Sequence, residues 1–293
     1  MHHVLRVLLL LVALATPALA RESRVDLGDR FYLIDLPEVA EGAPMILALH
    51  GGGGSPAQFA RSSGLGRAVT AAGYAVIFPA GTSRRGERFL TWNGGYCCGA
   101  AARDAVDDEA FLKAVIADAA ARFGLNGQRV FVTGMSNGAI LAESFAARNP
   151  RLVRAVAGVA GTMDTGRIRV AGPVPALVIH GTADDHVPYA GGRGEGALTG
   201  TDFAPVEAVV QAFLAAQPGV LSVTSSRIDA DPRDGTAAVV KDWARGGKVR
   251  VRLITVEGGG HHWPGGRKMR MAGGKTREID ANAELLRFFA PYR

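Results

Sequence analysis

The stretch RVFVTGMSNGAI, residues 129–140, carries the strongest structural signal in the chain. Three apolar residues lead to Ser136, which lies between Gly134 and Gly138, and small and aliphatic residues follow. This order predicts a buried strand, a sharp turn and a helix, with the serine hydroxyl raised above the end of a sheet. Glycine is needed on both sides because side chains there would collide with neighbouring backbone. GMSNG is the only G-x-S-x-G match in the chain, and it predicts that Ser136 is a nucleophile.

An earlier glycine run can supply the hydrogen-bond donors that such a serine needs. The apolar run at 45–49 is followed by HGGGG, residues 50–54, whose glycines leave the backbone open to close approach. We expect the amides of Gly51 or Gly52, together with that of Asn137, to bind the oxyanion of a tetrahedral intermediate. A phosphate-binding loop would need a Gly-Lys-Ser or Gly-Lys-Thr ending, whereas Gly-Ser-Pro follows here.

The general base is expected late in the chain, in GGGHHWPG at 258–265. The glycine run can bring an imidazole over the serine, so His261 is the first candidate and His262 the second. His50 and His180 each end an apolar run and are interpreted as structural. Adjacent histidines point in different directions and the sequence contains no H-E-x-x-H motif, so we expect no metal and no other cofactor.

The segment HGTADDHVP, residues 180–188, follows another apolar run and supplies two carboxylates. Asp184 is the preferred partner of the histidine, Asp185 is expected to be solvated, and Asp164 is the third candidate. A carboxylate in this role fixes the imidazole tautomer and stabilises the imidazolium. The pattern therefore predicts a Ser-His-Asp triad with Asp184 as its acid.

Continuous apolar runs bounded by glycine alternate with helical patterns along the chain. Such runs suit strands that are buried on both faces of a parallel sheet. The expected strands are 45–49, 74–78, 130–132, 155–160, 176–179 and 249–256. The expected helices are 107–123, 137–148, 203–216 and 278–289. This alternation predicts an α/β fold with a doubly wound, mostly parallel sheet and helices on both faces.

In sheets of this kind the ligand crevice lies outside the carboxyl ends of the strands. All the candidate catalytic residues fall at such ends. Two long segments, 187–201 and 263–276, are expected to be surface loops beside the crevice.

The first twenty residues, MHHVLRVLLLLVALATPALA, have the pattern of an export signal. A weakly basic start precedes an apolar run, which ends in a small-x-small motif at Ala20. We expect cleavage after Ala20, a secreted or periplasmic protein, and a single catalytic domain over 21–293. No later run is long and apolar enough to cross a bilayer, so we expect no stable membrane insertion after cleavage.

The chain carries a formal net charge of +6, and its basic residues concentrate in SRRGER at 83–88 and GRKMR at 266–270. Neither stretch has the interleaved aromatic residues of a single-strand nucleic-acid platform. An exported protein also rarely meets nucleic acid, so we expect no nucleic-acid partner. Solvated loops beside a site that favours acidic or polar substrates are the preferred interpretation.

The only two cysteines, Cys97 and Cys98, are adjacent. In an oxidising compartment they can pair only with each other or with another chain. Across a trans peptide their Cα atoms would lie ~3.8 Å apart, below the ~4.4–6.8 Å of ordinary disulfides. A strained vicinal disulfide and two reduced thiols therefore both remain open.

Six segments occur in the order in which one known family has them. They are LHGGG at 49–53, WNG at 92–94 with CCG at 97–99, VDD at 106–108, GMSNG at 134–138, HGTAD at 180–184 and GGGHHWPG at 258–265. Together they resemble the secreted polyhydroxybutyrate depolymerase-like esterases, the group that also contains bacterial feruloyl esterases. The resemblance covers nearly all of the chain after residue 20. It implies an α/β-hydrolase fold with Ser136, Asp184 and His261 as the triad.

Residues and resemblance together predict a secreted serine carboxylic ester hydrolase that acts through an acyl-enzyme. We recognise no appended substrate-binding domain, so we expect hydroxyalkanoate oligomers or feruloyl and other aryl esters rather than solid polyester. Trp92, Tyr96 and Trp263 are candidates either for the substrate pocket or for ordinary packing. The alternatives are a serine peptidase with the same triad, or a non-catalytic binding protein that retains the scaffold.

Overall fold

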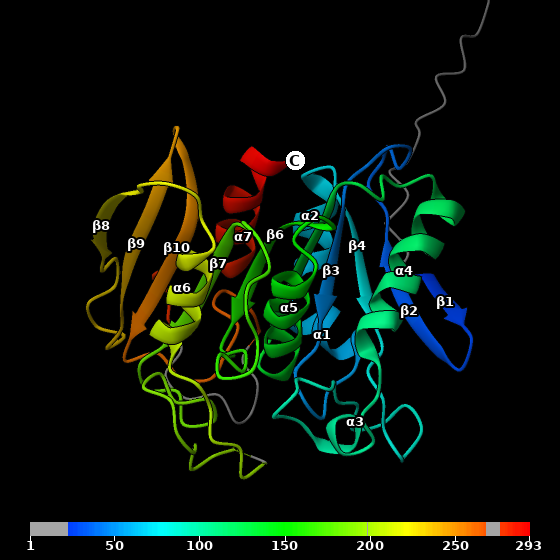
Figure 1. Cartoon of the computed structure of the whole chain (residues 1–293), viewed down its shortest axis with the longest axis horizontal. Helices are drawn as coiled ribbons and strands as arrows, with labels where there is room; N and C mark the ends of the chain where they lie inside the picture. The colour runs from blue at the N-terminus through cyan, green and yellow to red at the C-terminus, as the bar shows by residue number, and fades with distance from the viewer. Residues whose placement is uncertain (1–22, 198, 268–275) are drawn as a thin grey trace, which may run out of the picture.

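The computed structural model of the protein describes residues 23–197, 199–267 and 276–293, and one ten-stranded sheet runs through it (Figure 1). The strands are β1 (Ser23–Leu27), β2 (Arg30–Asp35), β3 (Met45–Leu49), β4 (Ala75–Pro79), β5 (Val130–Met135), β6 (Val153–Val159), β7 (Ala176–Gly181), β8 (Ser222–Ile228), β9 (Ala237–Arg245) and β10 (Lys248–Glu257). Their order across the sheet is β1-β2-β4-β3-β5-β6-β7-β10-β9-β8. The six central strands, β4, β3, β5, β6, β7 and β10, are parallel to one another. The antiparallel pair β1–β2 adjoins β4, and the antiparallel pair β8–β9 adjoins β10.

Helices cover both faces of the sheet (Figure 1). They are α1 (Pro56–Ser63), α2 (Leu65–Ala71), α3 (Gly99–Arg103), α4 (Asp108–Phe123), α5 (Asn137–Arg148), α6 (Val206–Ala215), α7 (Ala281–Phe289) and the 3-10 helix η1 (Ala290–Tyr292). Residues of α4, α5 and α6 join one half of the core, whereas those of α1, α2 and α7 join the other.

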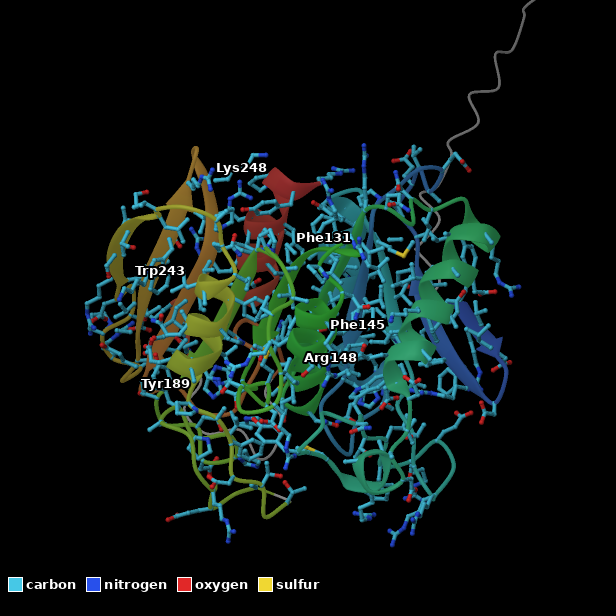
Figure 2. All side chains as sticks on the ribbon, viewed as in Figure 1. Phe131, Phe145, Arg148, Tyr189, Trp243 and Lys248 are labelled. Atoms are coloured by element: carbon cyan, nitrogen blue, oxygen red, sulfur yellow. A yellow bond between two sulfur atoms is a disulfide. The ribbon has the colours of Figure 1, made fainter. Side chains whose placement is uncertain are left out.

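Alternate residues of each buried strand enter opposite halves of the core. In β5, Val130 and Val132 pack in the half that contains Phe145 of α5, while Phe131 packs in the half that contains Phe289 of α7. Figure 2 marks Phe131 and Phe145 within these layers of side chains. Continuous apolar runs are therefore needed because both faces of these strands are buried.

All six predicted strands and all four predicted helices are present, and the predicted fold class is confirmed. The sequence pattern does not predict eight further elements of the described residues, namely β1, β2, β8, β9, α1, α2, α3 and η1. β8 is exposed along nearly its whole length and contains no continuous apolar run. α3 spans five residues, which is too short to show a helical period. These weaker elements flank the predicted centre of the sheet or lie in its loops.

Some sequence predictions fall outside the described residues. The expected export signal at 1–20 lies there, as do residues 268–275 of the second expected loop. Of the helices that can be described, none has both the length and the apolar character that a membrane span requires.

The register of the parallel strands aligns their carboxyl ends at one edge of the sheet. Leu49 of β3 pairs with Gly134 of β5, and Met135 of β5 pairs with Val159 of β6. Val159 in turn pairs with Ile179 of β7. In Figure 1 the loops that follow these strands gather at the lower end of the molecule. Residues that directly follow the strands therefore emerge side by side.

Candidate active site

The turn between β5 and α5 holds Ser136 in a conformation that few non-glycine residues adopt, with φ 56° and ψ −126°. Its N–H donates a hydrogen bond to the carbonyl oxygen of Val159 at 2.9 Å. A Cβ on Gly134 would lie 2.5 Å from the carbonyl carbon of Gly138. A Cβ on Gly161 would lie 2.5 Å from the carbonyl oxygen of Ser136. The strand, turn and helix predicted from the sequence are therefore present, and only glycine fits at these neighbouring positions.

Asp184 is a buried carboxylate on the loop after β7, surrounded by N–H groups. Its Oδ2 accepts a hydrogen bond from Nδ1 of His261 at 2.8 Å. Its Oδ1 accepts from the amides of His186 and Val187 at 2.9 and 2.8 Å. Burial opposes ionisation, but hydrogen bonds from the His180 and His261 imidazoles outweigh it and hold the pKa of Asp184 well below its ordinary value. The carboxylate is thus charged at neutral pH.

His261 follows β10 and lines the same cleft as Ser136. Because Nδ1 of His261 donates to Asp184, Nε2 keeps its lone pair, which is the protonation pattern of a general base. The second candidate, His262, does not line the cleft, and its Nδ1 lies 3.1 Å from the carbonyl oxygen of Gly260. The geometry therefore bonds His261 to Asp184, places His261 and Ser136 on the wall of one cleft, and leaves His262 outside that wall.

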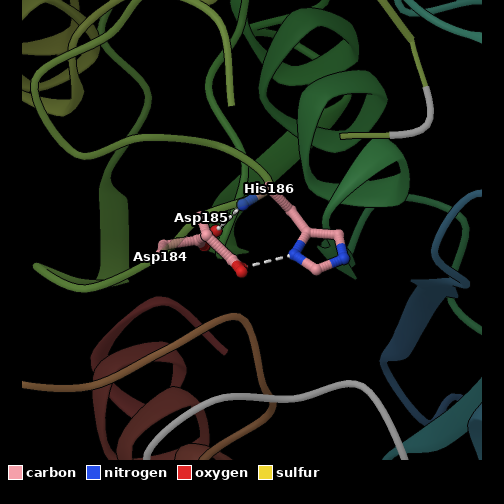
Figure 3. A group of neighbouring side chains, drawn as sticks. All are labelled: Asp184, Asp185 and His186. Atoms are coloured by element: carbon pink, nitrogen blue, oxygen red, sulfur yellow. Dashed lines mark hydrogen bonds and ion pairs between the residues drawn. The ribbon is translucent and has the colours of Figure 1, made fainter. Parts of the chain in front are cut away.

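The other acid candidates have different partners. Figure 3 shows the exposed carboxylate of Asp185 bonded to Nδ1 of His186, at 2.6 Å. Asp164 accepts hydrogen bonds from two amides of its own turn, both at 3.2 Å. Ligand atoms of Asp184, Asp185 and His186 lie within 4.8 Å of one another, as in a metal site. Both oxygens of Asp184 are already hydrogen-bonded, however, so we assign no metal to this group.

The ring of His186 stacks on the ring of His261, with centroids 4.7 Å apart and 10° between the planes. His186 also lines the cleft. The sequence pattern gave this residue no role, although it lies in the same segment as Asp184 and Asp185. Its position two residues after Asp184 is the signal that could have identified it, because the same tight loop then presents both the acid and the stacking ring.

The glycine run after β3 approaches the serine turn closely. A Cβ on Gly51 would lie 3.5 Å from Cβ of Ser136, and one on Gly52 would lie 3.4 Å from Cβ of Asn137. The amide of Asn137 is the first of α5, and the first amides of a helix have no partner within it. The three expected oxyanion donors therefore lie around the same cleft, at the positive end of the α5 dipole.

A polar network connects the glycine run with the serine turn. The side-chain amide of Asn137 accepts from the N–H of Trp92 at 2.8 Å and donates to its carbonyl oxygen at 3.0 Å. The indole N–H of Trp92 donates to the carbonyl oxygen of His50 at 2.9 Å. Burial lowers the pKa of His50 to about 4, so its ring is neutral, and its Nε2 accepts from the amide of Gly81 at 3.1 Å. This network fixes the segments that carry the candidate oxyanion donors.

The three aromatic residues considered for the substrate pocket do not line the cleft. Trp92 is fully buried in the network just described. The hydroxyl of Tyr96 donates to the carbonyl oxygen of Thr162 at 2.6 Å, and burial raises the pKa of Tyr96 to about 12. The indole N–H of Trp263 donates to Oδ1 of Asn282 at 3.0 Å. Ordinary packing, the alternative considered from the sequence, is the arrangement found.

The cleft has a volume of about 460 Å³. An apolar part of its wall contains Cys97, Ile140, Val187 and Phe203, which pack on one another. Part of the predicted loop at 187–201 borders the cleft, as expected. This apolar part of the wall suits the hydrocarbon portion of a small ester.

Cys97 and Cys98 are bonded to each other, so the structure contains the disulfide rather than two thiols. The peptide bond between them is cis and their Cα atoms are 3.1 Å apart, closer than the ~3.8 Å expected across a trans bond. Both residues line the cleft next to Ile140.

Comparisons with known proteins agree on one family. The description "Esterase PHB depolymerase" belongs to the family that matches residues 30–187. "Putative esterase NocK" of Nocardia uniformis subsp. tsuyamanensis is 32% identical over 254 residues, which span 78% of this chain and 68% of that protein. "Feruloyl esterase B" of Piromyces equi is 26% identical over 228 residues, which span 75% of this chain and 39% of that protein.

Solved structures show the same architecture. Acetyl xylan esterase from Aspergillus awamori aligns with a TM-score of 0.59 at 14% identity, over 92% of this chain and 99% of that chain. Esterase PE8 aligns with a TM-score of 0.55 at 18% identity, over 89% and 97% of the two chains. The likeness at these identities concerns the fold, which is the α/β-hydrolase fold.

Proposed function

The chain belongs to the polyhydroxybutyrate (PHB) depolymerase esterase family and is a carboxylic ester hydrolase; on this premise we propose that Ser136, His261 and Asp184 form its catalytic triad. The observation that carries the proposal is the 2.8 Å hydrogen bond from Nδ1 of His261 to the buried carboxylate of Asp184. It is supported by the position of Ser136 on a strained turn in the same cleft.

The first half of the proposed reaction forms an acyl-enzyme. Oγ of Ser136 attacks the ester carbonyl carbon while Nε2 of His261 takes its proton, and Asp184 stabilises the resulting imidazolium. The amides of Asn137 and of Gly51 or Gly52 hold the oxyanion. The tetrahedral intermediate then collapses: the carbon–oxygen bond to the alcohol breaks, and the alcohol leaves with the proton from His261.

The second half releases the acid. Water attacks the acyl carbonyl as His261 accepts one of its protons, and a second oxyanion forms in the same site. Collapse of this intermediate breaks the bond to Ser136, whose oxygen recovers the proton from His261. One ester and one water thus give one alcohol and one carboxylic acid.

We propose hydroxyalkanoate oligomers and feruloyl or other aryl esters as substrates. The family and the name of the Piromyces equi relative support these two classes. The cleft of about 460 Å³ with an apolar wall suits a short substrate of this kind. We also propose that the protein is exported, on the basis of the signal pattern at 1–20.

The test is hydrolysis of p-nitrophenyl butyrate, methyl ferulate and hydroxybutyrate oligomers by the protein and by its Ser136→Ala variant. We expect loss of the nucleophile to lower kcat by ~10⁶. Ser225→Ala on the exposed strand β8 is the control, and its kcat should match that of the unaltered protein. The member with the highest kcat/KM identifies the substrate class. Equal activity of the Ser136→Ala variant would overturn the mechanism.

A further inference from the structure

Arg103 stands out among the side chains of the cleft wall. Four ionisable side chains line the cleft within the described part of the chain: His50, Arg103, His186 and His261. Of these, only arginine keeps its charge at every physiological pH. We propose that Arg103 binds the free carboxylate of an anionic ester, so that the preferred substrates are short hydroxyacid oligomers rather than neutral esters. This inference rests on the proposed esterase function and specifies its substrate class.

The fold attaches Arg103 firmly to the rim of the cleft. Arg103 is the last residue of α3, a short helix that begins directly after the disulfide. The amide of Ala101 donates to Oγ1 of Thr91 at 3.2 Å, and a Cβ on Gly99 would lie 2.6 Å from Cγ2 of Thr91. Thr91 itself lines the cleft. The helix that carries the guanidinium is therefore packed against the cleft wall.

The adjacent carboxylate of Asp104 is bonded to Arg84, which lowers the pKa of Asp104 most, and its interaction with Arg103 is a weaker electrostatic one. Nε of Arg84 donates to Oδ2 of Asp104 at 3.0 Å, and its Nη2 bonds to Oδ1. Among the residues that the structure describes, none forms an ion pair or hydrogen bond with the guanidinium of Arg103. By contrast, Arg30 is partly buried and pairs with Asp108 at 2.8 Å. Arg103 is thus available to an external anion.

Further positive charge lies beside another residue of the cleft wall, Phe89. Phe89 lines the cleft and is 54% exposed, and the guanidinium carbons of Arg85 and Arg88 lie 5.9 and 5.6 Å from its ring centroid. The acid of this loop, Glu87, is paired with Arg24. In the described chain no carboxylate lines the cleft. The basic stretch singled out in the sequence therefore adds to a positive potential that attracts anions.

Hydroxyacid oligomers match this arrangement chemically. Each oligomer ends in a carboxylate, and a guanidinium can bind a carboxylate through two parallel hydrogen bonds. The rest of such a molecule is a short ester chain, which suits the apolar part of the wall. A neutral ester such as methyl ferulate has no carboxylate for Arg103 to bind. The structure thus favours one of the two proposed substrate classes over the other.

The experiment compares two substrates that differ only in charge: the linear dimer of 3-hydroxybutyrate and its primary carboxamide. The measured quantity is the ratio of their kcat/KM values. We expect the unaltered protein to prefer the dimer, Arg103→Gln to reduce the ratio about tenfold, and Arg103→Lys to reduce it less. Thermal unfolding establishes that each variant is folded.

Arg61→Gln is the matched control. Arg61 is exposed on α1 and does not line the cleft, so this substitution removes the same charge away from the site. Its ratio should equal that of the unaltered protein. An unchanged ratio in Arg103→Gln, an equal loss in Arg61→Gln, or no preference for the dimer would overturn the role of Arg103. Hydrolysis of p-nitrophenyl butyrate tests the esterase function separately from the role of Arg103. The unaltered protein must hydrolyse it, and the Ser136→Ala variant must not.

Discussion

Asp184 and Asp185 are adjacent carboxylates with different surroundings. Asp184 is buried, and it uses one oxygen for His261 and the other for two amides of its own loop. Asp185 is exposed, and within the described residues its carboxylate bonds to the ring of His186 alone. The motif places both carboxylates at the end of a strand. Which of them is buried, and so bonds to His261, depends on the fold of the loop that follows.

We therefore expect different effects from the same substitution at the two positions. Asp184→Asn should lower kcat about 10⁴-fold, since an amide no longer fixes the tautomer of His261 or stabilises its cation. Asp185→Asn should change kcat by less than about tenfold, because its carboxylate contacts only a stacking ring. Both are measured with p-nitrophenyl butyrate. A loss in Asp185→Asn as large as in Asp184→Asn would contradict this assignment.

His50 gives a prediction about stability in acid. Its pKa of about 4 in the folded protein lies below the ordinary value of 6.5, so the unfolded chain takes up the proton first as the pH falls. The free energy of unfolding is unaffected by this group above about pH 7, and it decreases by about 3 kcal/mol between about pH 6.5 and 4. In the His50→Gln variant, the free energy of unfolding should therefore fall by about 3 kcal/mol less between these pH values than in the unaltered protein.

Chemical denaturation at pH 7 and pH 4 measures the difference between the two proteins. Should the variant fail to fold, NMR titration of the His50 ring in the unaltered protein provides the same information. A ring that becomes protonated near pH 6 would contradict the prediction.

Three features of the site could not be read from single residues. The sequence could not decide whether Trp92 lines a pocket or packs, because an aromatic ring suits either environment. It could not show the stacking of His186 on His261, which requires the folded loop. It also could not single out Arg103, because Cys98 and Arg103 meet the cleft only after α3 has packed on Thr91.

At the scale of elements, the buried parallel strands were the predictable part of the fold. Both faces of such strands are covered, so their sequences are almost wholly apolar, and glycine lies at or near their carboxyl ends. β8 and β9 form an antiparallel pair at the sheet edge, and β8 is largely exposed. An exposed strand needs no apolar run, which is why hydrophobic pattern alone does not reveal it.

The serine turn gives a prediction at this scale. A Cβ on Gly138 would fall 2.5 Å from the carbonyl oxygen of His50 and closer still to that of Leu49, so β3 and α5 would have to separate. Gly138→Ala should therefore lower kcat by ~10²–10³, the loss expected when an oxyanion donor is displaced. It should also lower the melting temperature.

Gly127→Ala is the control for this substitution. Its new Cβ would meet only Cβ of Ala120 at 3.6 Å, an ordinary contact, so kcat and melting temperature should stay nearly unchanged. If Gly138→Ala kept full activity and stability, the close approach of the two segments would be incorrect.

At the scale of the whole molecule, the candidate triad combines three distant segments, around residues 136, 184 and 261. Motif order and chain direction were enough to predict that these segments meet, because parallel strands end at one edge. The path of the antiparallel pairs β1–β2 and β8–β9 could not be predicted in this way. Their positions follow from hydrogen bonding at the sheet edges rather than from any motif.

The proposed export signal gives a prediction about how the chain is processed. Expressed in a host that exports it, the protein should begin at Arg21, because the small-x-small motif ends at Ala20. N-terminal sequencing and intact mass of the exported protein measure this directly. A protein that retains residues 1–20 would contradict cleavage.

All the residues assigned to catalysis lie at the carboxyl ends of the parallel strands, so the opposite end of the molecule takes no part in the reaction. The hairpin between β9 and β10 turns at Gly246 and Gly247, just before Lys248, which Figure 2 marks at that far end. A linker inserted in this turn would tether the enzyme to a solid support or to a fused binding module while leaving the cleft facing the solution. The sheet thereby provides an attachment point that is mechanically separate from the chemistry.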